Sequence, residues 1–186
     1  MRCFIAIELP EHVKSKVFHE IEKLQTAEGI SGKFTDKNNL HLTLKFLGEL
    51  TEPEIEEIKT KLQEVSEKFS GSFDLLTQNY GFFPSKEHIK VVWLGVKDNE
   101  NKLLELEKEI SKNLLKYPGD FKEFKPHLTL GRIKDIRDKE KFFEKINNLK
   151  KIKESFQVNK IVLMKSELTS KGSLYRKIQE FNLERK

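Results

Sequence analysis

The sequence predicts an α+β protein in which strands outnumber helices. Three observations lead to this prediction: short apolar runs that alternate as strands do, longer segments with apolar residues at helical spacing, and a strand motif, HLTL, that occurs twice. The chain of 186 residues is long enough for one domain, or for two small lobes that share an interface. Because it contains no Gly/Ser-rich linker, we expect any two halves to pack directly on each other.

Each element is predicted from its apolar period and from its turn or cap residues. Thr51 followed by Glu54 has the pattern of a capping box that starts a helix with one apolar face. Residues 25–39 are expected to form a Gly-containing loop. In chain order, the predicted elements are a strand over 2–8, a helix over 10–24, a strand over 40–47, a helix over 51–69, strands over 72–83 and 88–96, a helix over 103–114, a strand through the second HLTL, a helix over 142–149, and strands over 155–159, 160–168 and 173–183.

Composition narrows the class of protein and its compartment. No apolar run approaches the ~18 residues that a membrane span needs, and the N-terminal residues lack the pattern of a signal peptide, so we expect a cytoplasmic protein. The single cysteine, Cys3, lies in an apolar strand and is expected to be a core thiol. A net charge of +5 permits a polyanionic partner such as RNA. The basic stretch from Lys150 is expected to be a solvated face.

The repeated HLTL places a histidine and a threonine on one face of each strand. His41 and Thr43 share a face because successive side chains of a strand alternate, while Leu42, Leu44 and Phe46 are expected on the opposite, apolar face. His127 and Thr129 repeat this arrangement 86 residues later. Two such strands facing one cleft would bring two imidazoles and two hydroxyls together.

This set of groups suits the chemistry of phosphodiesters. One neutral histidine can take a proton from an attacking water, while a protonated partner gives a proton to the leaving oxygen. Threonine hydroxyls can donate to the phosphoryl oxygens. A zinc site is disfavoured because neither motif has a second histidine or a carboxylate nearby at ligand spacing. In the alternative interpretation, the histidine of a His-x-Thr motif is a hydrogen-bonded structural residue without a catalytic role. The other histidines, His12, His19 and His88, are expected to be surface residues.

Several segments together resemble a known family. They are RCFIAIELP at the N-terminus, LHLTLKFLGE, GFFP with VVWLGV, FKPHLTLGR, and SELTSKGSLYRKI. In this order they resemble the 2H phosphoesterase superfamily, named for two H-x-T/S-x motifs, and within it the RNA 2′,3′-cyclic phosphodiesterases, also called 2′-5′ RNA ligases. The likeness covers nearly the full length of the chain.

The resemblance implies a fold and an activity. The fold would be a single bilobal domain over residues 1–186 with pseudo-twofold symmetry, antiparallel sheets lining a central cleft, helices outside, and one H-x-T motif from each lobe. The activity would be hydrolysis of an RNA terminal 2′,3′-cyclic phosphate, or of a nucleoside 2′,3′-cyclic phosphate, to a 2′-phosphomonoester. By this likeness His41 would be the proton donor and His127 the proton acceptor. We expect no cofactor, no metal and no membrane partner, and we expect a monomer.

The resemblance also suggests further site residues. Thr43, Thr129 and Arg132 would bind the phosphate, although strict alternation puts Arg132 on the face opposite His127 unless Gly131 bulges or the strand ends there. Phe4 and Tyr175 could line the cleft and stack on a base, or could be ordinary core aromatics. Trp93 is expected to be a core residue.

Two alternative functions use the same residues. In one, the chain is a non-catalytic module that binds an RNA end or a nucleotide phosphate without turnover. In the other, the enzyme joins RNA ends reversibly through a 2′-5′ linkage, with a 5′-hydroxyl in place of water. The sequence does not separate ligation from hydrolysis, and it does not by itself distinguish the acid from the base.

Overall fold

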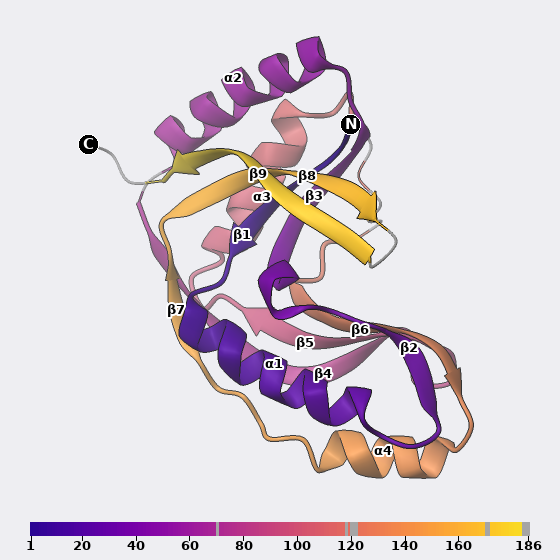
Figure 1. Cartoon of the computed structure of the whole chain (residues 1–186). Helices are drawn as coiled ribbons and strands as arrows, with labels where there is room; N and C mark the ends of the chain where they lie inside the picture. The colour runs from indigo at the N-terminus through magenta and orange to yellow at the C-terminus, as the bar shows by residue number, and fades with distance from the viewer. Residues whose placement is uncertain (70, 118, 120–122, 170–171, 184–186) are drawn as a thin grey trace.

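The computed structural model in Figure 1 describes residues 1–69, 71–117, 119, 123–169 and 172–183. Ser170 and Lys171, within the last of the family-like segments, lie outside this description. The elements are β1 (Arg2–Glu8), α1 (Glu11–Gln25), β2 (Ile30–Phe34), the 3₁₀ turn η1 (Lys37–Asn39), β3 (His41–Glu49), α2 (Glu52–Lys68), β4 (Phe73–Pro84), β5 (Ile89–Lys97), α3 (Lys102–Asn113), β6 (His127–Ile136), α4 (Lys139–Asn147), β7 (Ser155–Val158), β8 (Lys160–Thr169) and β9 (Gly172–Asn182).

The described strands form one curled antiparallel sheet of nine strands in the order β7-β4-β5-β6-β3-β1-β8-β9, with β2 also paired to β6. We call β1, β3, β8 and β9, with α2 and α3, the His41 lobe. The His127 lobe comprises β2 and β4 to β7, with α1 and α4. The lobes join where β3 pairs with β6 through Leu42 and Leu128. The expected α+β fold with antiparallel strands is confirmed, and the strands of the two lobes are continuous in one sheet.

The lobes exchange helices, as Figure 1 shows. Helix α1 follows β1 of the His41 lobe but packs on β2 and β6 of the other lobe. Helix α3 follows β5 of the His127 lobe but packs on α2 and β3. Neither lobe is therefore a continuous segment of the chain. Each lobe instead combines segments that are distant in the sequence.

Local sequence signals explain where several elements begin. The predicted capping box is present, because the Glu54 carboxylate accepts hydrogen bonds from the Thr51 backbone N–H at 2.9 Å and from its hydroxyl at 2.8 Å. Asp138 caps α4 by accepting from the backbone N–H of Lys141. The predicted loop over residues 25–39 is wrong in part, because Ile30–Phe34 forms β2. Its short sequence lacks an alternating apolar pattern, and it is held as a strand by pairing with β6.

The sheet separates two apolar layers. The main core lies between the sheet and the helices, and it includes the inward leucines of both HLTL motifs, which are at most 1% exposed. A smaller cluster of Phe4, Ala6, Val162 and Met164 lies apart from it on β1 and β8, and Phe46 and Tyr175 pack against it. This smaller cluster supports one side of the cleft described below.

The expectations for the cysteine and for three of the histidines are met. The Cys3 thiol is buried, and His12, His19 and His88 are exposed. Among the described residues, no helix is both long and apolar enough to cross a membrane.

Candidate active site

A cleft of about 610 Å³ lies between the two lobes. On one side it is bounded by β2 and β6, and on the other by β1, β3 and the paired ends of β8 and β9. Both H-x-T strands reach it. The predicted site residues that line it are Phe4, His41, Thr43, Thr129, Arg132 and Tyr175, and the further residues used below are Arg2, Lys33, Phe34, Asp36, Asn39, Phe46, Leu168 and Ser173.

The backbone holds the His41 ring in a fixed tautomer. His41 Nδ1 lies 2.7 Å from the carbonyl oxygen of Asn39. Because a carbonyl can only accept, Nδ1 carries the proton and Nε2 of the neutral ring is an acceptor. Nε2 lies 3.0 Å from Thr43 Oγ1, which therefore donates to it. The side chain of Asn39 in turn donates to the backbone carbonyl of Ser173 on β9, at 2.8 Å.

A hydrogen bond from Nδ1 to a backbone carbonyl also fixes His127. Its Nδ1 lies 2.6 Å from the carbonyl of Lys125, which stands two residues before the histidine, as Asn39 does before His41. Nε2 is again the nitrogen left for chemistry. The ring packs edge-on against Phe83 at 4.9 Å and lies 6.0 Å from Trp93, between ring centroids. His127 itself is not among the residues lining the cleft, although Thr129 and Arg132 of the same strand are.

The pairing of the two strands brings the four motif side chains together. Leu42 lies opposite Leu128 in antiparallel register, so His41 points toward Thr129 and Thr43 toward His127 on the same face. The two histidines are diagonal in this arrangement. A positive charge on His127 lowers the pKa of His41, after the larger effect of burial, which agrees with their proximity.

Both H-x-T strands contain a bulge at the same offset from the histidine. On β3, Lys45 pairs with Ile5 and Thr43 pairs with Ala6, so Leu44 is an extra residue. On β6, Gly131 pairs with Val92 and Thr129 with Trp93, so Leu130 is the extra residue. A bulge changes the phase of alternation. The side chain three positions after each threonine therefore returns to the cleft face.

These bulges bring Phe46 and Arg132 into the cleft. Arg132 lines the cleft with Thr129, and its charge acts on the pKa of His127. The bulge lies at Leu130, one residue before the expected position at Gly131, and it turns Arg132 to the cleft. A Cβ at Gly131 would lie 2.8 Å from Cδ1 of Phe34, so glycine allows β2 to approach here. Phe46 occupies the position in β3 that Arg132 occupies in β6.

Both histidines have a lowered pKa in the cleft, which favours their neutral forms. Burial lowers the pKa of His41 to about 4, against the opposing effect of its hydrogen bond to Asn39. Burial also lowers the pKa of His127, and the Arg132 guanidinium lowers it further, while the hydrogen bond to Lys125 raises it. A bound phosphate would oppose both shifts, because its negative charge favours the imidazolium form.

Aromatic side chains surround His41. The Phe4 ring lies 4.9 Å from His41 and the Tyr175 ring 5.2 Å, between centroids. Phe4 is 2% exposed, so it supports the cleft from below, while Tyr175 is half-buried at its wall. Trp93 is half-buried beside His127, and its indole Nε1 is buried without a hydrogen-bond partner among the described residues. The expectation that Trp93 is a core residue is wrong, because it lies outside both apolar clusters and its ring packs beside Phe83 and His127.

Sequence reasoning missed several residues at this site. Strict alternation placed Phe46 on the apolar face with Leu42 and Leu44, and this prediction is wrong because the bulge at Leu44 turns Phe46 to the cleft. Aligning HLTLKF with HLTLGR puts Phe46 at the position of Arg132 and could have found it. Asn39 and Lys33 had no signal, because their segment was assigned to a loop and its pairing with β6 is long-range. Among the described residues, no group of three or more His, Cys, Asp and Glu is arranged to hold a metal ion.

Comparison with known proteins identifies the family. A model of the 2′-5′ RNA ligase superfamily matches residues 13–169. The chain is 36% identical over 188 residues to an RNA 2′,3′-cyclic phosphodiesterase of Methanocaldococcus jannaschii, with 97% of this chain and 100% of the relative covered. It is 37% identical over 186 residues to one of Thermotoga maritima, with 99% and 96% covered.

Solved structures share the fold. The protein TT0787 of Thermus thermophilus superposes with a TM-score of 0.81 at 26% identity, with 98% of each chain covered. Escherichia coli LigT in its apo form gives 0.77 at 22% identity, with 99% of this chain and 98% of LigT covered. The chain belongs to the 2′-5′ RNA ligase superfamily.

Proposed function

We propose that this protein hydrolyses the 2′,3′-cyclic phosphate at an RNA terminus, or on a nucleoside, to a 2′-phosphomonoester. The observation that carries the proposal is the paired H-x-T strands, each with a histidine fixed through Nδ1 and its Nε2 left for proton transfer. The names of the relatives from M. jannaschii and T. maritima support the same activity. We infer a monomer in the cytoplasm, as the sequence suggests.

The reaction needs one base and one acid. His127 Nε2 takes a proton from water as the water oxygen bonds to phosphorus. The bond between phosphorus and the 3′ oxygen breaks, and His41 Nε2–H donates a proton to that oxygen. The product carries a 2′-phosphate and a 3′-hydroxyl. Each histidine ends in the opposite protonation state, so proton exchange with solvent restores the pair.

The phosphoryl oxygens are held by the threonines and by Arg132. In the free cleft the Thr43 hydroxyl donates to His41 Nε2. When Nε2 of His41 also carries a proton, it can no longer accept a hydrogen bond from Thr43. The Thr43 hydroxyl is then free to donate to a phosphoryl oxygen. Thr129 offers a second hydroxyl, and Arg132 offers a guanidinium suited to two oxygens at once. These groups would stabilise the charge that builds up in the transition state.

Substrate binding sets the protonation of His41. With a pKa of about 4 in the free cleft, His41 is not a proton donor at neutral pH. The phosphate of the substrate adds negative charge beside the ring and raises its pKa, so that the acid forms in the complex. We therefore expect a bell-shaped dependence of rate on pH whose acidic limb differs between the free enzyme and the complex.

The test is product analysis. Purified protein is incubated in EDTA with an RNA ending in a 2′,3′-cyclic phosphate, beside His41→Ala and His127→Ala, and 2′- and 3′-monophosphates are resolved. The proposal expects 2′-phosphate from the wild type and almost none from either variant. A wild type that binds the RNA end but leaves the cyclic phosphate intact would overturn it in favour of a binding module.

A further inference from the structure

The cleft contains more positive charge than the scissile phosphate requires. Arg132 serves the reacting phosphate, but Arg2 and Lys33 also line the cleft. Both side chains are exposed, and within the part of the chain that the structure describes neither forms an ion pair with a carboxylate. Many other lysines of this protein pair with nearby glutamates. Unpaired cations in a cleft indicate an anionic ligand.

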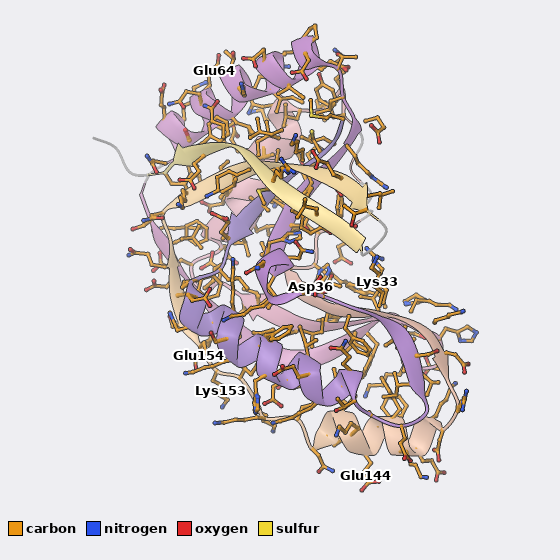
Figure 2. The ribbon with its side chains drawn as sticks, viewed as in Figure 1. Lys33, Asp36, Glu64, Glu144, Lys153 and Glu154 are labelled. Carbon is orange, nitrogen blue, oxygen red and sulfur yellow. The ribbon has the colours of Figure 1, made fainter. Side chains whose placement is uncertain are left out.

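Lys33 spans the cleft from one lobe toward the other. It lies on β2 of the His127 lobe, opposite Arg132 on β6. A Cβ placed at Gly172, at the start of β9, would lie 3.0 Å from Lys33 Nζ, so the ammonium group rests against the backbone of the His41 lobe. Figure 2 shows Lys33 and Asp36 between β2 and the ends of β8 and β9. Lys33 thus stands at the mouth of the cleft, which Asp36 also lines.

Arg2 occupies the opposite wall. It begins β1, and its register partners are Glu49 on β3 and Ser166 on β8. Ser166 also lines the cleft, as does Leu168 two residues farther along β8. The aromatic ring of Tyr175 lines the same wall. A positively charged groove with an aromatic side chain is a feature of surfaces that bind single-stranded nucleic acid.

We propose that Arg2 and Lys33 bind phosphates on the 5′ side of the terminal nucleotide, and thereby make RNA ends better substrates than nucleoside 2′,3′-cyclic phosphates. This inference rests on the proposed function, since it places the terminal cyclic phosphate at His41 and His127. A nucleoside cyclic phosphate has one phosphate, which Arg132 and the two threonines already satisfy. A chain of two or more nucleotides brings further phosphates to the mouth of the cleft, where the two free cations lie.

The experiment compares two substrates with the same terminal nucleoside: the nucleoside 2′,3′-cyclic phosphate and a four-nucleotide RNA with that end. The variants are Arg2→Gln, Lys33→Gln and, as a matched control, Lys108→Gln at an exposed position of α3. We expect each cleft variant to lower kcat/KM for the RNA by about tenfold, mainly through KM, as for loss of one hydrogen bond to a charged group. The loss on the nucleoside should be at least about fivefold smaller.

Salt provides a second measurement that a merely structural role would not change. For single-stranded nucleic acid, the slope of log K against log salt is about −0.7 per phosphate contact. Each cleft variant should therefore flatten the slope for RNA binding by about 0.7, and Lys108→Gln should not change it. Equal losses on both substrates, or an unchanged salt slope, would overturn the proposal.

Binding separates this inference from the proposed function. The affinity for the four-nucleotide RNA is measured by fluorescence anisotropy in a His127→Ala background, where turnover is not needed. If the wild type hydrolyses neither substrate, the proposed function fails, while weaker RNA binding by Lys33→Gln and Arg2→Gln would still support the phosphate-binding mouth. If Arg2→Gln and Lys33→Gln in the His127→Ala background bind the RNA as tightly as His127→Ala alone, then these two side chains do not bind phosphates.

Discussion

The two H-x-T strands use the same backbone design but carry different side chains after it. In both, the histidine Nδ1 donates to a carbonyl two residues earlier, and a bulge follows the threonine. After the bulge, β3 presents Phe46 and β6 presents Arg132. After the threonine, the His41 strand therefore presents an aromatic ring to the cleft where the His127 strand presents a guanidinium.

This difference suggests how two similar motifs take on two roles. Aromatic rings of Phe4 and Tyr175 surround His41, in an environment suited to a nucleoside and its departing oxygen. Arg132 stands near His127, where a guanidinium favours the neutral imidazole that a base requires. We propose that the shared backbone design positions the two histidines, and that their different neighbours help to distinguish acid from base.

The largest effects are expected when either histidine is removed. His41→Gln and His127→Gln should each lower kcat by about 10²–10⁴-fold on an RNA cyclic phosphate, because each removes one of the two proton transfers. Single-turnover rates at saturating substrate would measure this loss. Full activity in either variant would show that the two strands are not partners in one reaction.

Truncating Arg132 and Phe46 in turn tests the contrast between the two H-x-T strands. Arg132→Ala should reduce kcat by about 10²-fold, because it removes charge stabilisation in the transition state. Phe46→Ala should act mainly on KM, by about tenfold, as loss of a stacking contact would. Steady-state kinetics on the same RNA separates the two parameters. If both variants change kcat and KM in the same proportion, Arg132 and Phe46 do not have different roles.

Acid should destabilise the folded protein through His41. Its pKa is about 4 when folded, against ~6.5 when unfolded, so its contribution is complete above pH 6.5 and is lost as pH falls toward 4. The free energy of unfolding should fall by at most about 3 kcal/mol from this group over that window.

Denaturant titrations at several pH values would measure this loss. His41→Gln should flatten the dependence on pH between 6.5 and 4, while His12→Gln at an exposed position should leave it as in the wild type. If the free energy of unfolding of His41→Gln depends on pH as that of the wild type does, the low pKa does not belong to His41.

The smallest effect is expected at Asn39. Its carbonyl, which any residue retains, anchors His41, while its side chain donates to Ser173. Asn39→Ala should therefore cost about 1 kcal/mol of stability and only a few-fold in kcat. Thermal unfolding and steady-state kinetics would measure both. A loss as large as that of His41→Gln would mean that the link from β9 to His41 is itself essential.

Much of this architecture was predictable because its signals are local. The strands, the helices and the capping box of α2 follow from apolar period and from cap residues near in sequence. The shared face of His41 and Thr43 follows from strand alternation alone. In contrast, the antiparallel pairing of Leu42 with Leu128 and the formation of β2 depend on contacts between distant segments.

Arg132 shows most clearly where prediction from the sequence fails. Alternation placed it on the wrong face, and only the one-residue bulge at Leu130 returns it to the cleft. The glycine at 131 indicates that a bulge is possible, but β3 bulges equally with Lys45 at the equivalent position. Residue type therefore does not fix the bulge, and the pairing partners do. The roles of the site residues stay predictions until they are measured.

The most direct test of the central claim is leaving-group rescue. A cyclic substrate in which sulfur replaces the 3′ oxygen releases a thiolate, which needs no proton, so it bypasses the acid but not the base. The account predicts that His41→Ala recovers to within about tenfold of the wild type on this substrate, while His127→Ala stays about 10²-fold or more below it. Equal impairment of both variants, or rescue of His127→Ala alone, would contradict the division of roles between the two lobes.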